Sequence, residues 1–172
     1  MELRKLKKKD AKRMLQWMHD ITVVGDLKTD FLSKTMFDCE EFIEKSQSGS
    51  DLNLAVVDEN DAYQGTVSLK NIRDNNAEFA IVVCKDAMGK GYSEWAMKQI
   101  LEVGFTDYNL DEIYWYVDKK NTRALKFYNK NHYQDVDVSE ICIYKELTEV
   151  EKKRYVWFRI TKKEWGERDA DN

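Results

Sequence analysis

The chain has 172 residues, a net charge of −4, 42% hydrophobic and 35% charged residues. This composition excludes a disordered chain, fits one folded domain and disfavours a nucleic-acid partner. No apolar run approaches the ~18 residues of a membrane span, so no membrane association is expected. The three cysteines form no CxxC pair. They therefore argue against a disulfide framework and structural zinc, and they favour a cytoplasmic location.

The N-terminal part is predicted to begin with one strand and one helix. Residues 2–6 fit a strand, and Asp10 is expected to open a helix whose apolar residues recur at helical spacing. Residues 21–35 show no clear period. We expect an irregular connection there.

The next helix is predicted to begin at a capping box. Asp38 is the expected N-cap, with Glu41 three residues later. Phe37 and Phe42 stand where a hydrophobic staple would place them. The helix is expected to run to about Ser46.

From residue 52 the hydrophobic period changes to two, which is typical of strands. Residues 52–56 and 63–69 predict a hairpin, with Gly65 at a possible bulge. Residues 77–84 are apolar on both faces after their first acidic residue. This pattern predicts a central strand that is covered on both sides.

Helices and strands alternate in the following segment. A helix is expected at 92–105, a strand at 113–117 and a second helix at 121–130. Asn121 is the predicted N-cap of the second helix, and Asn131 is the predicted left-handed residue that ends it.

The remaining residues complete the predicted α/β (α+β) fold. Two more strands are expected at about 135–145 and 153–161, followed by a loose polar tail. The strand–helix–strand order at 77–117 implies a right-handed parallel pair, and the hairpins imply antiparallel neighbours. We therefore expect a mixed, mostly antiparallel sheet of about six to seven strands with helices on both faces. Residues 1–165 would form the single domain and 166–172 the tail.

A buried strand runs directly into a glycine-containing loop that opens a helix, at residues 81–93. Such a loop leaves backbone N–H groups unpaired at a helix N-terminus, which is a ready anion site. Gly89 and Gly91 would let the backbone approach a phosphate, or would serve a turn that needs positive φ. The patterns GxxxxGK[ST] and GxGxxG are absent, which disfavours a nucleoside triphosphatase and a dinucleotide oxidoreductase.

Two motifs of this region resemble those of the GNAT superfamily of acyl-CoA-dependent N-acetyltransferases. The family loop [Q/R]-x-x-G-x-[G/A] corresponds to Met88-Gly89-Lys90-Gly91-Tyr92-Ser93. Gly91 fits this pattern, whereas Met88 and Ser93 depart from it. Residues 121–128 match Asn-x-x-Ala-x-x-[Phe/Leu]-Tyr in full. The likeness covers residues 2–145. Residues 77–92 are most similar to the Rim-type branch, and residues 124–133 also resemble bacterial amino-sugar-nucleotide N-acetyltransferases.

The resemblance implies direct acetyl transfer from acetyl-CoA to a primary amine, with no metal. The acceptor would be a small amine, an amino sugar nucleotide or a protein N-terminus, and the assembly a monomer or homodimer. A lysine amine costs roughly 4–5 kcal/mol to deprotonate at pH 7 and an α-amine about 1, which favours α-amines or amino sugars. Because Met88 and Ser93 depart from the motif, a non-catalytic acyl-CoA-binding or sensor protein remains the alternative. A protein-interaction module that keeps only the fold is a third class.

The resemblance also implies roles for individual residues. Pantetheine would pair with the backbone of residues 81–83, and the pyrophosphate would bind the N–H groups of residues 88–93. The expected cofactor-binding residues are Ile81, Val82, Val83, Met88, Gly89, Lys90, Gly91, Tyr92, Ser93 and Asn121. Asn121 either contacts pantetheine or only caps its helix.

The resemblance further implies two catalytic residues and a region that binds the acceptor. Tyr128 would be the general acid that protonates the leaving thiolate, although an aromatic pair at a helix end also serves packing. Glu78 would be the general base, or else a solvent-facing residue at a strand end. The region that borders the acceptor would contain Trp17, His19 and Asp20. His19 could equally be a partner of the helix dipole.

Overall fold

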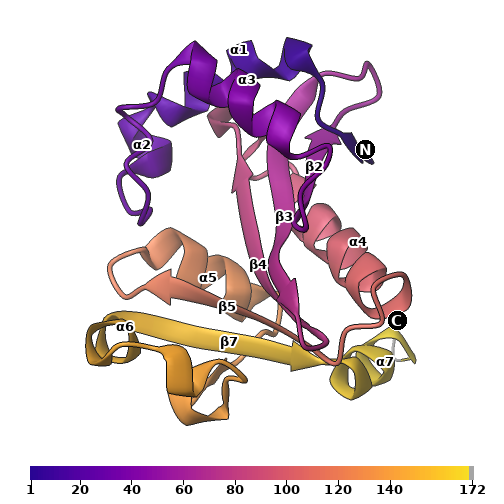
Figure 1. The fold of residues 1–172 in the computed structure, drawn as a ribbon, viewed down its shortest axis with the longest axis vertical. Coiled ribbons are helices and arrows are strands. Elements are labelled where there is room, and N and C mark those ends of the chain that lie inside the picture. Colours follow the sequence, from indigo (N-terminus) through magenta and orange to yellow (C-terminus); the bar gives the residue numbers. More distant parts are fainter. Residues whose placement is uncertain (171–172) are drawn as a thin grey trace.

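The computed structural model describes residues 1–170, and seven strands form one sheet in this part of the chain (Figure 1). The order across the sheet is β1-β2-β3-β4-β5-β7-β6. The strands are β1 (Glu2–Lys5), β2 (Leu52–Val57), β3 (Tyr63–Arg73), β4 (Asn76–Val83), β5 (Glu112–Asp118), β6 (Asp135–Val136) and β7 (Tyr155–Thr161). Only the pair β4–β5 is parallel among these strands. The predicted α/β (α+β) fold, with a mostly antiparallel sheet and a parallel pair, is confirmed.

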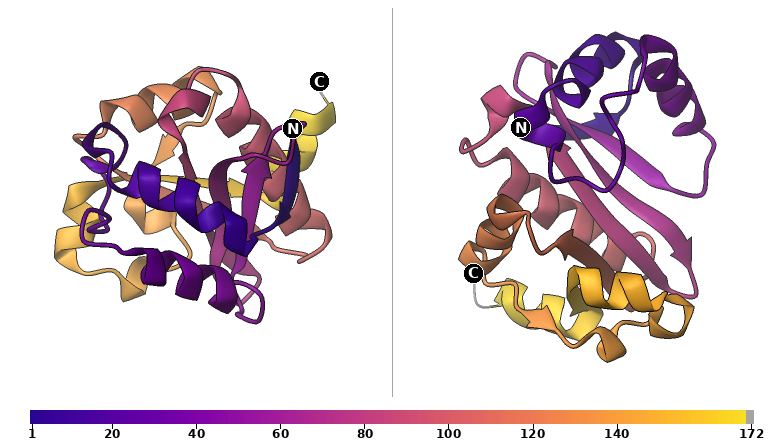
Figure 2. Two further views of the ribbon diagram at one scale, coloured as in Figure 1. Left: turned by 90° about the horizontal axis from the view of Figure 1, so that it is seen from above. Right: turned by 90° about the vertical axis from the view of Figure 1, so that its left-hand side faces the viewer.

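Helices cover both faces of this sheet, as Figures 1 and 2 show from three sides. They are α1 (Ala11–Met18), α2 (Ile21–Val24), α3 (Met36–Lys45), α4 (Tyr92–Thr106), α5 (Thr122–Lys130), α6 (Glu149–Arg154) and α7 (Lys162–Ala170). Helices α4 and α5 pack against one face, and their apolar residues share a core with β3, β4, β5 and β7. Helices α1, α2 and α3 pack on the other face against the N-terminal strands.

Trp115 of β5 lies at the centre of the first core. It is 1% exposed, and its ring stacks on Phe158 of β7 at a centroid distance of 5.5 Å. The ring of Tyr128 from α5 lies 5.4 Å from Trp115 on the same face. Full burial of side chains of this size stabilises the fold by about 1.5–3 kcal/mol each. The aromatic core therefore fixes α5 against β5 and β7.

The parallel pair β4–β5 is short. Its register contains three residue pairs, and Glu78 opposite Tyr114 is the last of them. Beyond this point β4 continues to pair with β3 as far as Val83, and β5 continues to pair with β7 as far as Asp118. Each strand is held by its outer neighbour while the inner edges separate, as the diverging β4 and β5 arrows of Figure 1 show. One backbone edge of β4 is left without a strand partner.

Gly65 lies at the predicted bulge. Val56 pairs with Gly65 but Val57 pairs with Tyr63, so one extra residue of β3 is accommodated here. A Cβ on Gly65 would lie 2.4 Å from the carbonyl oxygen of Val82 and 2.8 Å from Cα of Val83. Glycine is needed because β4 passes this close to β3.

The start of α3 corrects the predicted capping box. Thr35 is the N-cap and Asp38 is its N3 partner: Thr35 N donates to Asp38 Oδ2 at 2.7 Å, and Asp38 N donates to Thr35 Oγ1 at 3.3 Å. Asp38 and Glu41 therefore do not form the box. Phe37 falls in the first turn and is 71% exposed, so it forms no hydrophobic staple. Starting one turn earlier places Cys39 and Ile43 on the buried face.

Three further elements differ from the predictions. Residues 21–24 of the expected connection form the short helix α2, because Asp20 accepts a hydrogen bond from Thr22 N and caps it. His132, not Asn131, takes the left-handed conformation after α5, with φ of 60°. Strand β6 has two residues instead of about eleven. Asp137 accepts from Ser139 N and starts a 3₁₀ turn that ends the pairing with β7.

The C-terminal residues also differ. Helix α7 continues through residues 166–170, where the sequence indicated a loose tail. Trp165 packs on the first core, and its ring stacks with Phe105 at 6.0 Å. This contact anchors α7 to α4. Residues 171–172, the end of the predicted tail, lie outside the described part of the chain.

We predict that Gly65→Ala lowers the free energy of unfolding by about 1–3 kcal/mol, because the added methyl group overpacks the β3–β4 contact. Urea denaturation measures the change. Gly166→Ala is the matched control, since a Cβ there meets no atom within 4 Å. The control should be neutral or stabilising by up to about 1 kcal/mol, as expected for alanine in a helix. Equal stability of Gly65→Ala and wild type would show that the close approach is not needed.

Candidate active site

The separation of β4 and β5 opens into a cavity of about 540 Å³. This volume lies in the range of small-molecule and cofactor sites. Its walls come from β4, β5, α5, the loop before α4 and the connection between α2 and α3. The predicted residues that line it are Glu78, Ile81, Val82, Val83, Met88, Gly89, Ser93, Asn121 and Tyr128.

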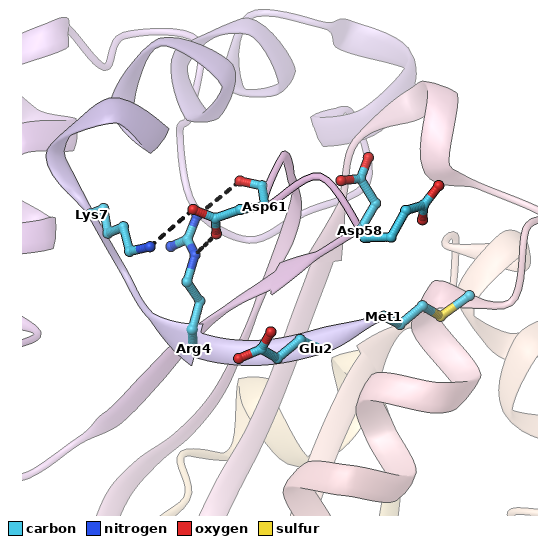
Figure 3. Close-up of a pocket in the computed structure, with 7 residues that line it drawn as sticks. Met1, Glu2, Arg4, Lys7, Asp58 and Asp61 are labelled. Atoms are coloured by element: carbon cyan, nitrogen blue, oxygen red, sulfur yellow. Dashed lines mark hydrogen bonds and ion pairs between the residues drawn. The ribbon is translucent and has the colours of Figure 1, made fainter.

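A second cavity, of about 260 Å³, lies beside β1 and the turn between β2 and β3 (Figure 3). Three of its charged side chains pair with one another: Asp61 binds Arg4, and Lys7 Nζ lies 2.9 Å from Asp61 Oδ2. Hydrogen bonds from Lys9, Arg4 and Lys7 hold the pKa of the Asp61 carboxyl well below its usual range. This second cavity contains none of the predicted site residues and is part of the packing of the N-terminal strand.

The loop before α4 presents bare backbone amides. Gly89 and Gly91 both have positive φ, of 74° and 84°, and Gly91 is the N-cap of α4. Among the described residues no acceptor is found for the N–H groups of Gly89, Gly91, Tyr92 and Ser93. These donors lie at the positive end of the helix dipole, which is a favourable place for an anion.

The other two predicted donors of the loop are already engaged. Met88 N donates to Lys85 O at 3.2 Å, and Lys90 N donates to Ala87 O at 3.4 Å. The first bond ends the 3₁₀ turn at Lys85–Ala87, and the second closes the turn that follows it. Lys90, Gly91 and Tyr92 do not line the cavity itself, whereas Gly89 and Ser93 on either side of them do.

Residues 81–83 form the separated part of β4. They pair with β3 on one side, and on the side of β5 they have no strand partner. Their side chains pack on the second core, Ile81 packs on the first core as well, and all three residues line the cavity. This segment therefore serves the core through its side chains and leaves one backbone edge open to an added extended ligand.

Tyr128 lies at the inner end of the cavity. Its ring is 6% exposed and packs 5.1 Å from Phe158, and no described residue forms a hydrogen bond with its hydroxyl. Burial raises the pKa of Tyr128 well above its usual range. The phenol is therefore protonated at physiological pH and can donate a proton.

Asn121 caps α5 as predicted. Its Oδ1 accepts from Ala124 N at 3.0 Å, and the residue is 5% exposed on the cavity wall. The cap fixes the first turn of the helix that carries Tyr128.

Glu78 stands at the last residue pair before the strands separate. Its carboxylate is half-buried, accepts from Asn71 Nδ2 at 3.1 Å, and lines the cavity. Burial and the negative charge of Glu78 together raise the pKa of Tyr116, which places that hydroxyl near the carboxylate. Tyr116 lines the cavity, whereas Tyr114 is buried.

The three residues expected near the acceptor do not line this cavity. Trp17 is buried and its Nε1 donates to Tyr63 Oη at 3.1 Å, His19 Nε2 lies 2.7 Å from Lys34 O, and Asp20 caps α2. Helix α2 turns the chain after Asp20. The residues that follow reach the cavity instead, namely Val23, Asp26, Leu27, Lys28, Thr29 and Phe31.

Arg123 is a cavity residue that sequence reasoning missed. Its guanidinium donates to Thr22 O at 2.7 Å and to Val23 O at 2.9 Å, and lies 3.7 Å from the sulfur of Met88. It ties α5 to α2 and to the loop before α4. Arg123 occupies an x position of the motif Asn-x-x-Ala-x-x-[Phe/Leu]-Tyr, where any residue is allowed. The sequence around it therefore gave no indication of these contacts.

Neither a metal centre nor a membrane span is found in residues 1–170. No group of three or more His, Cys, Asp or Glu side chains there is arranged to hold a metal ion. None of the helices in the same part of the chain has the length and apolarity to cross a membrane.

The comparisons with known proteins agree with this geometry. The family described as "Acetyltransferase (GNAT) domain" matches residues 1–134. Acetyltransferase PseH of Campylobacter jejuni is 24% identical over 145 residues, covering 80% of this chain and 88% of that protein. Spermidine N(1)-acetyltransferase of Escherichia coli is 38% identical over 68 residues, covering 38% of this chain and 37% of that protein.

A solved structure shows the same fold. Spermidine N-acetyltransferase of Vibrio cholerae, in complex with CoA and spermine, superposes with a TM-score of 0.77 at 20% identity, covering 95% of this chain and 96% of that one. The family match and these relatives do not distinguish the branch within the superfamily. The chain belongs to the GNAT acetyltransferase family, and it is an acetyl-CoA-dependent N-acetyltransferase.

Proposed function

We propose that the enzyme binds acetyl-CoA where β4 and β5 separate and transfers the acetyl group directly to a primary amine. One observation carries this proposal. The unpaired edge of β4, the bare amides of Gly89 and Ser93 and the Tyr128 side chain belong to residues that line the same cavity.

The cofactor would be held mainly by backbone groups. The pyrophosphate would accept hydrogen bonds from the N–H groups of Gly89, Gly91, Tyr92 and Ser93, supported by the dipole of α4. The pantetheine amides would pair with residues 81–83 like an added strand. Because these donors belong to the backbone, the departures at Met88 and Ser93 do not remove them.

The reaction would use one residue on each side of the thioester. Glu78 would accept the proton of the amine, directly or through water, as the amine attacks the thioester carbonyl. The C–S bond then breaks, and Tyr128 protonates the leaving thiolate. Holding amine and thioester together can contribute up to ~7–11 kcal/mol toward the barrier.

The acceptor would be a primary amine on a small molecule or a peptide. Two of the relatives are spermidine N-acetyltransferases. The Rim-type likeness of residues 77–92 adds protein N-termini, and the likeness of residues 124–133 adds amino sugar nucleotides. We further propose a cytoplasmic monomer or homodimer. The three free cysteines, two of them buried, support a reducing compartment.

The second candidate function is a non-catalytic acyl-CoA sensor. Engagement of the Met88 amide and the contact between Met88 and Arg123 favour it, because they change the first position of the loop motif. Titration with acetyl-CoA, followed by measurement of free thiol with a panel of amines, separates the two. We expect amine-dependent thiol release. Binding without such release would support the sensor.

We predict that Tyr128→Phe lowers kcat by about 10²–10⁴-fold, because the thiolate loses its proton donor. The aromatic packing is retained, so the affinity for CoA should change by less than about twofold. Steady-state kinetics and calorimetry measure both. Tyr133→Phe is the matched control, because that ring packs on Trp115 but does not line the cavity. An unchanged kcat in Tyr128→Phe would remove Tyr128 from the mechanism.

We also predict that Gly91→Val weakens CoA binding by about 10-fold or more, since a β-branched residue is strained at a φ of 84°. Calorimetry gives the dissociation constant. Gly91→Asn is the control, because asparagine tolerates positive φ and a Cβ here meets only Met1 Cε at 3.9 Å. It should bind nearly as well as wild type. Normal binding by a folded Gly91→Val protein would exclude the loop as the pyrophosphate site.

A further inference from the structure

Lys28 reaches across the cavity from the connection between α2 and α3. Its ammonium lies 3.4 Å from Glu151 Oε1 of α6, 5.5 Å from the ring centroid of Tyr116 and 5.7 Å from that of Tyr155. Lys28, Tyr116 and Tyr155 all line the cavity. An amine of the chain itself therefore occupies the side of the cavity that contains Glu78.

The groups around this ammonium are well placed to recognise a cation. The rings of Tyr116 and Tyr155 are 4.7 Å apart and tilted by 45°. Both pack further on Trp157, at 5.1 and 6.3 Å. Two aromatic faces and a carboxylate within reach are the chemistry that binds an ammonium group. We call Tyr116, Tyr155 and Glu151 the cation cage.

The cation cage is connected to the candidate base. Tyr116 lies between Lys28 and the carboxylate of Glu78, whose charge contributes to the raised pKa of the Tyr116 phenol. Among the other basic residues of the cavity, Arg123, Lys126 and Lys130 belong to α5, on the opposite face of the sheet, and Lys70 of β3 is paired with Glu78 in the strand register. The lysines of α5 suit the phosphates of the cofactor, whereas the cage suits a positive charge on the acceptor.

We propose that the cation cage binds a second, non-reacting ammonium group of an aliphatic diamine acceptor, and that Lys28 occupies this subsite until the acceptor displaces it. The inference rests on the proposed function and specifies the acceptor class. Rings and a carboxylate stabilise the protonated form, so the caged amine cannot be the nucleophile. A caged positive charge also lowers the pKa of the neighbouring reacting amine, which eases its deprotonation by Glu78.

The test is calorimetric titration of the CoA-saturated enzyme with 1,4-diaminobutane and with butylamine. We expect the diamine to bind at least about 10-fold more tightly than the monoamine. Lys28→Met should raise the diamine affinity about 3- to 10-fold, because it removes the internal competitor. Lys45→Met, an exposed lysine of α3, is the matched control and should leave the affinity unchanged.

Two variants of the cage walls complete the test. Tyr116→Leu should weaken diamine binding about 3- to 10-fold, whereas Tyr116→Phe retains the ring and the affinity. Glu151→Gln keeps the capping bonds with Thr148 and removes the negative charge of the cage. This variant therefore tests the contribution of the cage to diamine affinity even if Tyr116→Leu fails to fold. It too should weaken diamine binding.

Failure of this inference differs from failure of the proposed function. Equal affinity for diamine and monoamine, or no gain in Lys28→Met, would overturn the cation subsite while acetyl transfer to butylamine persists. Acetylation of an amino sugar nucleotide with no binding of the diamine would overturn it as well. Binding of CoA without transfer to any amine would instead contradict the proposed function.

Discussion

The separation of β4 from β5 after Glu78 is the constraint on which the rest of the site depends. Parallel neighbours satisfy each other's backbone groups, and these two strands do so for only three residue pairs. Beyond these pairs each strand continues with its outer neighbour alone, since β3 pairs with β4 to Val83 and β7 pairs with β5 to Asp118. The result is a rigid cavity with an unpaired backbone edge. Such an edge is where an extended ligand with alternating amides can bind.

The two faces of the sheet give this cavity two different sides. On one face α4 and α5 supply the bare amides and the buried phenol of Tyr128, which suit a phosphorylated thioester and its leaving group. On the other face Glu78 and Tyr116 meet the long connection after α2. The cofactor and the acceptor would therefore approach the same gap from opposite faces. This arrangement explains why Lys28 can occupy the acceptor side of the cavity without closing the cofactor side.

Much of the fold and part of the site could be predicted because the signals are local. The alternation of β2 and β3, the central position of β4 and the Asn121 cap all depend on residues within a few positions of one another. The predicted burial of β4 on both faces is incomplete, because Glu78 and residues 80–82 are half-buried at the cavity. The glycines of the loop before α4 were identified for the same reason. Their positive φ values confirm the conformation for which glycine was expected.

The sequence predictions were wrong where two local patterns compete for the same helix start, or where contacts between residues far apart in the sequence determine the structure. Both Thr35-x-x-Asp38 and Asp38-x-x-Glu41 fit a capping box, and burial of Cys39 and Ile43 accompanies the earlier start. The 3₁₀ turn after Asp137 shortened β6 although the residues alternate. Arg123 and Lys28 act across 100 or more positions of sequence, through partners on α2 and α6. No local pattern could identify them.

A crystal structure of the enzyme with bound CoA tests the central claim most directly. The account predicts pyrophosphate oxygens within hydrogen-bond distance of the N–H groups of Gly91 and Ser93, pantetheine along residues 81–83, and the sulfur next to the Tyr128 hydroxyl. CoA bound outside the separation of β4 and β5, or with its sulfur away from Tyr128, would contradict it.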